Sequence, residues 1–220
     1  MTAQNLISEA VPPLKLSDTG QKALDWMSSF HVQHLPITNG KKYVGMIAEY
    51  DILDSNYAEK SFAEYDWTEK QVFVHYNTHI YDVVKIINDN HLSLIAVLDE
   101  DDEYLGVISL QNLLDYFAEV NAMKERGGII ILEMNVNDYS LSEIAQIVES
   151  HNAKILSMYV TTNTLSTKMD VTIKINKTEL RRIIATFERY SYTIKASYQE
   201  NSYMADVQER YDSFMNYLNI

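Results

Sequence analysis

The chain contains side chains that often do chemistry in proteins, but not at catalytic or metal-binding spacings. The acidic run Asp99–Glu103 lacks the alternate-position ligands and the central glycine of a known calcium loop, so we interpret it as a solvated hairpin tip. The six histidines include no pair on one helix face with a partnering carboxylate, which argues against zinc. No nucleophile elbow, Walker loop or dinucleotide fingerprint is present in the sequence. We therefore expect no catalytic residue, no metal, no cofactor and no enzyme activity.

The composition narrows the class of partner. The 220 residues carry a net charge of −13 with a pI near 4.8, which would repel nucleic acid and an anionic membrane surface. Most of this charge lies in residues 1–126, which have 20 acidic against 9 basic side chains, a net −11. The chain has no cysteine and no apolar stretch approaching the ~20 residues that span a bilayer. We expect a cytoplasmic protein.

Residues 11–120 contain the same unit twice. His31 and His91 lie in matching segments 60 residues apart, while Gly45 and Gly106 lie 61 residues apart. The extra residue falls in a turn, where insertions are best tolerated. The matching segments are Phe30–Val32 with Asn90–Leu92, Leu35–Ile37 with Ile95–Val97, and Val44–Ile47 with Leu105–Ile108. Because a duplicated unit tends to pack as a pseudo-twofold pair, the groove between its halves is where we expect a ligand.

The hydrophobic pattern predicts the order β-α-β-β-α for each copy. In the first copy, Ser17 or Asp18 is expected to cap a helix that buries Ala23, Leu24, Met27 and Phe30. A tight turn at Asn39-Gly40 joins two strands. The expected elements are strands at Leu14–Leu16, Leu35–Thr38 and Lys42–Ala48 with a helix at Glu49–Ser55, then strands at Val72–His75, Leu94–Leu98 and Tyr104–Ser109 with helices at Ile80–Asn90 and Leu110–Val120. We interpret residues 56–71 as a linker.

A second domain is predicted after a hinge at Gly127-Gly128. The apolar run Ile129–Leu132 predicts a strand covered on both faces, and Ser140 is spaced to cap the next helix. The pattern continues to Tyr198 as β-α-β-β-α-β, the ferredoxin-like order. The spacing of apolar residues in the segment 200–220 predicts an amphipathic helix that docks on its own chain or on a dimer mate. The expected α+β protein thus has residues 1–126 as a repeat pair (copies at about 11–57 and 71–120), residues 127–199 as a second domain and residues 200–220 as a terminal helix.

The doubled unit resembles the cystathionine-β-synthase (CBS) domain. The residues that carry the resemblance are Leu35–Ile37 before the hairpin, Val44–Ile52 after it, and Leu105–Leu113 in the second copy. The segment Gly128–Tyr198 is similar in topology to an ACT-type regulatory domain, and the whole arrangement looks like the bacterial acetoin-utilisation regulatory protein family. This resemblance implies a homodimeric regulatory module that binds an adenosine-containing ligand, such as AMP, ADP, ATP or S-adenosylmethionine, in a CBS cleft.

The resemblance also implies site residues. In the family, the stretch after the glycine ends in Thr or Ser, and an Asp follows three residues later; here those positions are Ala48 and Asp51 in the first copy, and Ser109 and Asn112 in the second. Asp51 would then bind a ribose, and Ser109 a phosphate. Both residues are equally well placed to cap helices, with no ligand at all. Backbone groups expected to contact the base are those of Leu35, Ile37, Leu94 and Ala96.

Charge favours some of these ligands over others. A triphosphate entering an acidic module loses coulombic energy unless cations intervene, and near the first cleft only Lys15, Lys41 and Lys42 are obvious. A monophosphate, a neutral nucleoside or a sulfonium should therefore enter more easily.

Two further hypotheses remain open. In ACT domains the loop after the first strand captures amino acids, so Asn137 or Asp138 could hold an amino group; the glycine common in that loop is missing, which favours a packing role for both residues. The chain could instead be a dimeric interaction scaffold with degenerate clefts and no small-molecule ligand.

Overall fold

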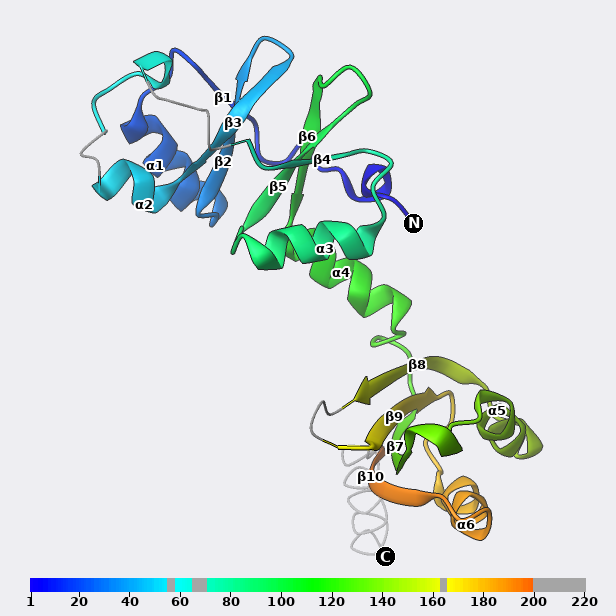
Figure 1. Cartoon of the computed structure of the whole chain (residues 1–220). Helices are drawn as coiled ribbons and strands as arrows, with labels where there is room; N and C mark the ends of the chain where they lie inside the picture. The colour runs from blue at the N-terminus through cyan, green and yellow to red at the C-terminus, as the bar shows by residue number, and fades with distance from the viewer. Residues whose placement is uncertain (55–57, 65–70, 163–165, 200–220) are drawn as a thin grey trace, which may run out of the picture. The chain divides into compact units, whose positions relative to one another are not determined.

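The computed structural model describes residues 1–54, 58–64, 71–162 and 166–199 (Figure 1). The amphipathic helix predicted at 200–220 lies outside the described residues. The chain divides into two compact units, the first spanning Met1–Phe117 and the second beginning at Ala118. Within the described residues, no helix is long and apolar enough to cross a membrane.

The first unit contains the predicted β-α-β-β-α order twice. The elements of the first copy are β1 (Leu14–Lys15), α1 (Gly20–Phe30), β2 (His34–Asn39), β3 (Lys42–Ala48) and α2 (Glu49–Asp54). Those of the second are β4 (Phe73–His75), α3 (Ile80–Asp89), β5 (Leu94–Leu98), β6 (Tyr104–Ser109) and α4 (Leu110–Val120), and a short 3-10 helix, η1 (Ala3–Leu6), precedes both copies. Each sheet has three strands, with the first pair parallel and the second antiparallel. Even the register shifts correspond, since one lies between Ile37 and Thr38 and the other between Val97 and Leu98.

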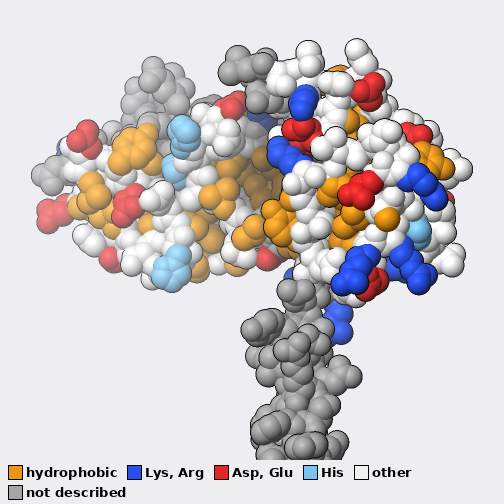
Figure 2. Space-filling view, turned by 90° about the horizontal axis from the view of Figure 1, so that it is seen from below, with side chains coloured by type: hydrophobic (Ala, Val, Ile, Leu, Met, Phe, Trp, Pro, Cys, Tyr) orange, Lys and Arg blue, Asp and Glu red, His pale blue; other side chains and the backbone are white. Residues whose placement is uncertain are grey.

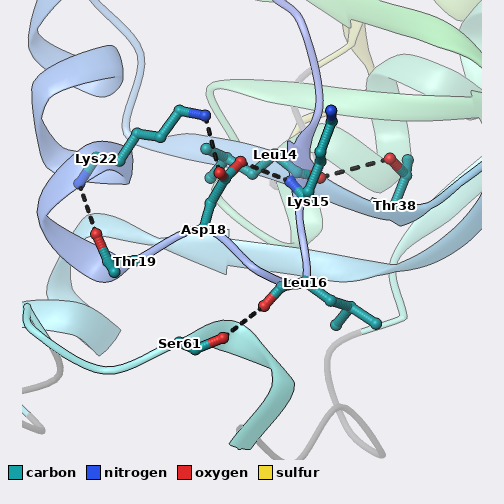
Figure 3. Close-up of polar contacts among 8 residues, drawn as sticks. All are labelled: Leu14, Lys15, Leu16, Asp18, Thr19, Lys22, Thr38 and Ser61. Carbon is teal, nitrogen blue, oxygen red and sulfur yellow. Dashed lines mark hydrogen bonds and ion pairs between the residues drawn. The ribbon is translucent and has the colours of Figure 1, made fainter.

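The first helix begins differently from the prediction, as Figure 3 shows. Its N-cap is Thr19, whose hydroxyl accepts a hydrogen bond from the Lys22 backbone N–H, so Ser17 and Asp18 were the wrong choices. Asp18 instead accepts from the Lys15 N–H and from Lys22 Nζ, each at 2.8 Å. The carboxylate thus fastens the end of β1 to the first turn of α1.

Two expectations about burial in this unit were wrong. Phe30 ends α1 with 37% of its surface exposed, whereas Ala23 and Met27 are buried. The supposed linker contributes Phe62 to the core, fully buried within a second 3-10 helix, η2 (Phe62–Glu64). Ser61 fixes this segment by donating from its hydroxyl to the Leu16 carbonyl at 2.8 Å (Figure 3).

The two copies share a core. Leu94, Ala96 and Val107 of the second copy belong to the same buried cluster as Leu35 and Ile37 of the first. Burying the apolar faces of central strands against each other stabilises the pair by ~25 cal/mol per Å² of apolar surface removed from water. Packing of the sheets therefore fixes the geometry of the groove between the copies.

The second unit has the predicted ferredoxin-like order. Its elements are β7 (Gly128–Asn135), η3 (Val136–Asp138), α5 (Leu141–Ser150), β8 (Ile155–Thr162), β9 (Lys168–Ile175), α6 (Arg181–Arg189) and β10 (Thr193–Gln199). The sheet order is β10-β7-β9-β8, with antiparallel neighbours throughout. Ser140 caps α5 as predicted, accepting from the Glu143 N–H. Residues of α5 and α6 pack with alternate residues of the strands into one core.

One expectation about β7 needs correction. The strand is not buried equally on both faces, because Ile130 and Leu132 are buried whereas Ile129 and Ile131 are only half-buried. Gly128 begins this strand and Gly127 precedes it, both in tight packing, and the hinge expected at this pair stays a prediction. A Cβ on Gly127 would lie 2.0 Å from the Ile175 carbonyl oxygen, and one on Gly128 would lie 2.5 Å from the Leu180 side chain. Close approach of the backbone therefore accounts for both glycines.

Candidate ligand cavity

A cavity of about 480 Å³ lies between the two copies of the first unit. Its walls come from four places: the segment leading from α1 into β2, the end of β3 with the first turn of α2, the residue before β4, and the segment leading from α3 into β5. The described lining residues are Gln33, His34, Met46, Ala48, Glu49, Tyr50, Asp51, Val72, Asn90, His91 and Leu92. The volume suits a small organic ligand, and the location is the groove between the halves that the duplication predicts.

Hydrogen bonds between the copies hold one wall of the cavity. The Ser93 backbone N–H donates to His34 Nδ1 at 3.2 Å, and the Ser93 hydroxyl oxygen lies 3.1 Å from the same nitrogen. That hydroxyl also accepts from the Gln33 N–H at 2.9 Å. Because His34 is only 8% exposed, these bonds satisfy polar groups that would otherwise be buried unpaired. One wall of the cavity is therefore held in place by hydrogen bonds between the two copies.

His31 and His91 occupy equivalent backbone positions. Each follows the last turn of its helix with a positive φ, 55° for His31 and 53° for His91. A left-handed residue at this point ends a helix and turns the chain sharply into the next strand. His91 lines the cavity because the second copy's turn faces the first copy's strands.

Asp51 is the predicted site residue that the structure brings to the cavity. It is 9% exposed in the first turn of α2, and its Oδ2 accepts from the Ala48 N–H at 3.3 Å. The carboxylate thus acts as a helix cap while lining the cavity. The two predicted roles are compatible, because a carboxylate has further lone pairs to offer.

Ser109 and Asn112 are engaged with each other. The Ser109 hydroxyl donates to Asn112 Oδ1 at 2.8 Å, while the Asn112 N–H donates back to the Ser109 hydroxyl at 3.2 Å. The Ser109 N–H also donates to Asn112 Oδ1, at 3.0 Å. This closed set caps α4, and neither residue is among those lining the cavity. Phosphate binding by Ser109 and ligand contact by Asn112 stay predictions.

The residues expected at the base lie deeper in the unit. Leu35, Ile37, Leu94 and Ala96 are all fully buried in β2 and β5 and are not among the lining residues. Base contact through their backbone groups stays a prediction. The groups that sequence reasoning missed are those in the segments entering β2 and β5, chiefly His34 and His91, and Glu49 at the start of α2. Only the repeat offset, which places both segments at one interface, could have indicated them.

The lysines near the first cleft in sequence lie elsewhere in the fold. Lys15 lines a separate hollow with Thr38 and Asn39, and Lys41 pairs with Glu103 at 3.0 Å. Neither these nor Lys42 is among the lining residues of the cavity.

The acidic run forms a hydrogen-bonded turn at a hairpin tip. Asp99 Oδ1 accepts from the Asp101 N–H at 2.9 Å and from the Glu103 N–H at 2.8 Å, and Asp102 takes a positive φ of 59°. Within the described residues, no group of three or more histidine, aspartate or glutamate side chains is arranged to hold a metal ion.

The second unit has a hollow of about 410 Å³ where β7 ends. Asp138 lines it and accepts from Asn135 Nδ2 at 2.9 Å, whereas Asn137 is exposed and is not among its lining residues. The Tyr192 hydroxyl donates to Glu143 Oε2 at 2.6 Å in the same hollow. Burial and this hydrogen bond raise the pKa of the Tyr192 phenol far above its usual value. An amino-acid site at Asn137 or Asp138 stays a prediction.

These features define a class of protein: a paired α+β repeat with a ligand-sized cavity between its copies, followed by a ferredoxin-like domain. The CBS domain family model matches residues 66–119, which include the second copy except for the last residue of α4. The chain therefore carries a CBS domain, and its first copy has the same order of elements.

Similar proteins are found both among curated sequences and among solved structures. An uncharacterized protein of Methanocaldococcus jannaschii is 22% identical over 120 residues, which make up 48% of this chain and 40% of that relative. The match thus covers less than half of the curated relative's length. Among solved structures, a CBS domain pair/ACT domain protein of Thermotoga maritima is 19% identical, covering 54% of this chain and 98% of its own, with a TM-score of 0.47.

Two other solved structures are comparable. A putative acetoin utilization protein of Vibrio cholerae is 15% identical, covering 56% of this chain and 95% of its own, with a TM-score of 0.48. CBSX2, solved in complex with AMP, is 17% identical, covering 54% of this chain and 97% of its own, with a TM-score of 0.46.

Proposed function

We propose that this chain is a regulatory protein that binds an adenosine-containing ligand in the cavity between its CBS copies. The ligand class follows from the CBS domain, whose paired clefts typically take such molecules. The observation that carries the proposal is the position of Asp51, a nearly buried carboxylate on the wall of a cavity of about 480 Å³. A carboxylate there can accept from both hydroxyls of a ribose.

Occupancy would act on the fold through the cavity walls. The ligand would touch segments from both copies and so favour one relative arrangement of those segments over another. A ligand shifts such an equilibrium only by its differential affinity for the two states. The second unit, which we assign an ACT-like role, would relay this change or take part in dimerisation.

Isothermal titration calorimetry with adenosine as the probe tests the proposal. Asp51→Asn should weaken binding about tenfold or more, because a hydrogen bond to a charged group contributes about 1.5–3 kcal/mol. Asp54→Asn is the matched control, since Asp54 lies exposed on the same helix outside the cavity lining. Equal affinity of the two variants would remove Asp51 from the site. If adenosine, AMP, ADP, ATP and S-adenosylmethionine all failed to bind the folded protein at millimolar concentration, the scaffold function would replace the sensor.

We also propose that the protein is a cytoplasmic homodimer. Leu53 on α2 and Leu114 on α4 occupy equivalent repeat positions and are 63% and 60% exposed. Hydrophobic side chains show on the helical side of the first unit in Figure 2. Equivalent apolar residues on both copies form a surface that a second chain can match by twofold symmetry.

Sedimentation equilibrium tests the dimer. Leu53→Glu with Leu114→Glu should shift the protein from dimer to monomer, because burying two carboxylates in an apolar interface is costly. Leu105→Glu serves as the control, because Leu105 is also partly exposed but lies on β6 rather than on a helix. A wild-type chain that sediments as a monomer would exclude the homodimer.

A further inference from the structure

The charged side chains on the described walls of the cavity are acidic. Glu49 and Asp51 both line it, and no lysine or arginine is among the described lining residues. Asp51 is nearly buried and Glu49 half-buried, so water screens their charges less than it would on an open surface. A phosphate brought into this space would meet two like charges.

The described lysines of the first copy are engaged elsewhere or are absent from the lining. Lys22 pairs with Asp18 at 2.8 Å, and Lys41 pairs with Glu103 at 3.0 Å. Lys15 lines the separate hollow beside Thr38.

The first copy has no hydroxyl at the repeat position where the second copy has Ser109. Ala48 occupies the repeat position of Ser109 and offers a methyl group. Its backbone N–H already donates to Asp51. The serine that could donate to a phosphate is in the other copy, where it is bonded to Asn112.

His34 does not supply a positive charge to the cavity. Its Nδ1 accepts from the Ser93 N–H, which requires that nitrogen to carry no proton and so fits the neutral ring. His91 is exposed at the cavity wall and faces the solvent as well.

We propose, resting on the adenosine-binding function above, that this cavity selects nucleosides whose 5′ substituent is uncharged or cationic and disfavours nucleotides that carry a phosphate. Asp51 binds the ribose, and the space beside Ala48 and Glu49 receives the 5′ substituent. A sulfonium or an amine there meets a favourable potential. A monophosphate carries less charge than a triphosphate but is repelled as well, so the expectation from the sequence that a monophosphate enters easily is revised here.

Calorimetry at pH 8 in low salt without magnesium tests the selection. Adenosine should bind about tenfold or more tightly than AMP, because the phosphate would lie close to the like charges of Glu49 and Asp51. S-adenosylmethionine should bind more tightly than S-adenosylhomocysteine, which lacks the sulfonium charge. Raising the salt concentration should bring both affinity ratios closer to one.

Substitutions in the cavity should change the ratio of the affinity for adenosine to the affinity for AMP. Ala48→Ser with Glu49→Gln adds a donor and removes a charge, so AMP should gain about tenfold relative to adenosine. Asp54→Asn removes the same charge from α2 outside the cavity and should leave the ratio unchanged. The ratio within each variant, rather than the absolute affinity, is the readout, so a modest loss of stability does not obscure it.

The outcomes separate the two proposals. If AMP binds the wild-type protein as tightly as adenosine or more tightly, the selection is overturned while the adenosine-binding function stands. If no nucleoside or nucleotide binds, the function itself fails, and the selection fails with it.

Discussion

His34 of the first copy accepts a hydrogen bond from the backbone of Ser93 in the second copy, at a wall of the cavity. The Ser93 hydroxyl adds a link to the Gln33 N–H, so one residue of the second copy bonds to two consecutive residues of the first. Both bonds join residues about 60 positions apart in sequence. They fix the packing of the copies where a ligand would contact both.

A double-mutant cycle at this junction should reveal coupling. His34→Phe leaves the Ser93 N–H without its partner, and Ser93→Ala removes the acceptor of the Gln33 N–H; each should cost about 1 kcal/mol of unfolding free energy. Because the residues share contacts, the double variant should deviate from additivity by about 0.5 kcal/mol or more. Urea unfolding followed by tryptophan fluorescence measures this, since Trp26 and Trp67 both lie within the first unit's span. Strict additivity would mean that the two side chains act independently.

Asp18 should make the stability of the first unit depend on acid pH. Burial raises the pKa of its carboxyl, but the hydrogen bonds from Lys22 and Lys15 and the charges of both lysines outweigh burial, so the pKa lies below its usual value of 3.8. A lowered pKa stabilises the fold above the unfolded-state pKa, and this contribution is lost as the pH falls through the folded-state pKa.

Asp18→Asn should therefore lower the unfolding free energy by about 1 kcal/mol at pH 7, a modest figure because Lys22 is 41% exposed and solvent screens the ion pair. The difference from wild type should shrink below about pH 4. Asp25→Asn, exposed on the same helix, is the comparison and should show a smaller effect at pH 7. A difference that stays constant between pH 7 and pH 3 would contradict a role for the Asp18 charge.

Phe62 should contribute more to stability than any surface aromatic residue. The side chain is fully buried among residues of both copies, so Phe62→Ala leaves a cavity and should cost about 3–5 kcal/mol. Phe30→Ala removes the same atoms from a site that is 37% exposed and should cost about 1 kcal/mol or less. Denaturant midpoints compare the two directly. Similar costs at both positions would mean that the segment around Phe62 is not part of the cooperative core.

The N-terminal segment should pack against β6 normally only when residue 106 is glycine. Its φ is +151°, and a Cβ there would lie 2.6 Å from the Ile7 side chain and 3.1 Å from the Ser8 carbonyl oxygen. Ser8 exchanges two backbone hydrogen bonds with Val107. Gly106→Ala should cost about 1–3 kcal/mol and expose the amides of Ser8 and Val107 to hydrogen exchange.

Gly40→Ala is the matched control for this variant. Gly40 also has a positive φ, +64°, but a Cβ there would meet nothing within 4 Å. Gly40→Ala should lower the free energy of unfolding by about 1 kcal/mol through backbone strain alone, and the Ser8 amide should stay protected from hydrogen exchange. If both variants deprotected Ser8 equally, the steric explanation for Gly106 would be wrong.

Periodicity predicted the regular elements well because the same pattern occurs twice and each copy supports the other. The strands at Leu94–Leu98 and Tyr104–Ser109 and the helix at Leu110–Val120 have the predicted bounds. Thr19 was missed as a cap because three adjacent polar residues could serve, and only the path of the chain selects one. Phe62 was missed because a lone aromatic residue between polar neighbours carries no periodic signal.

The cavity was predictable in position but not in its chemistry. The resemblance brought Asp51 to attention, and the repeat offset placed it beside the other copy. Nothing in the sequence shows that Ser109 is bonded to Asn112, because that depends on side-chain rotamers in a particular turn. The segments that carry His34 and His91 have no pattern of their own, so their convergence is visible only in three dimensions.

The hairpins of the two copies are joined at their tips as well. Lys41 pairs with Glu103, its carbonyl accepts from the Tyr104 N–H at 2.8 Å, and Lys42 bridges to Glu103 through the backbone. Together with the hydrogen bonds among Gln33, His34 and Ser93, these contacts join the two copies at two separate points. Separating the two copies about either of these points would break the hydrogen bonds at the other. A molecule bound in the cavity would therefore meet walls whose separation is limited at two places.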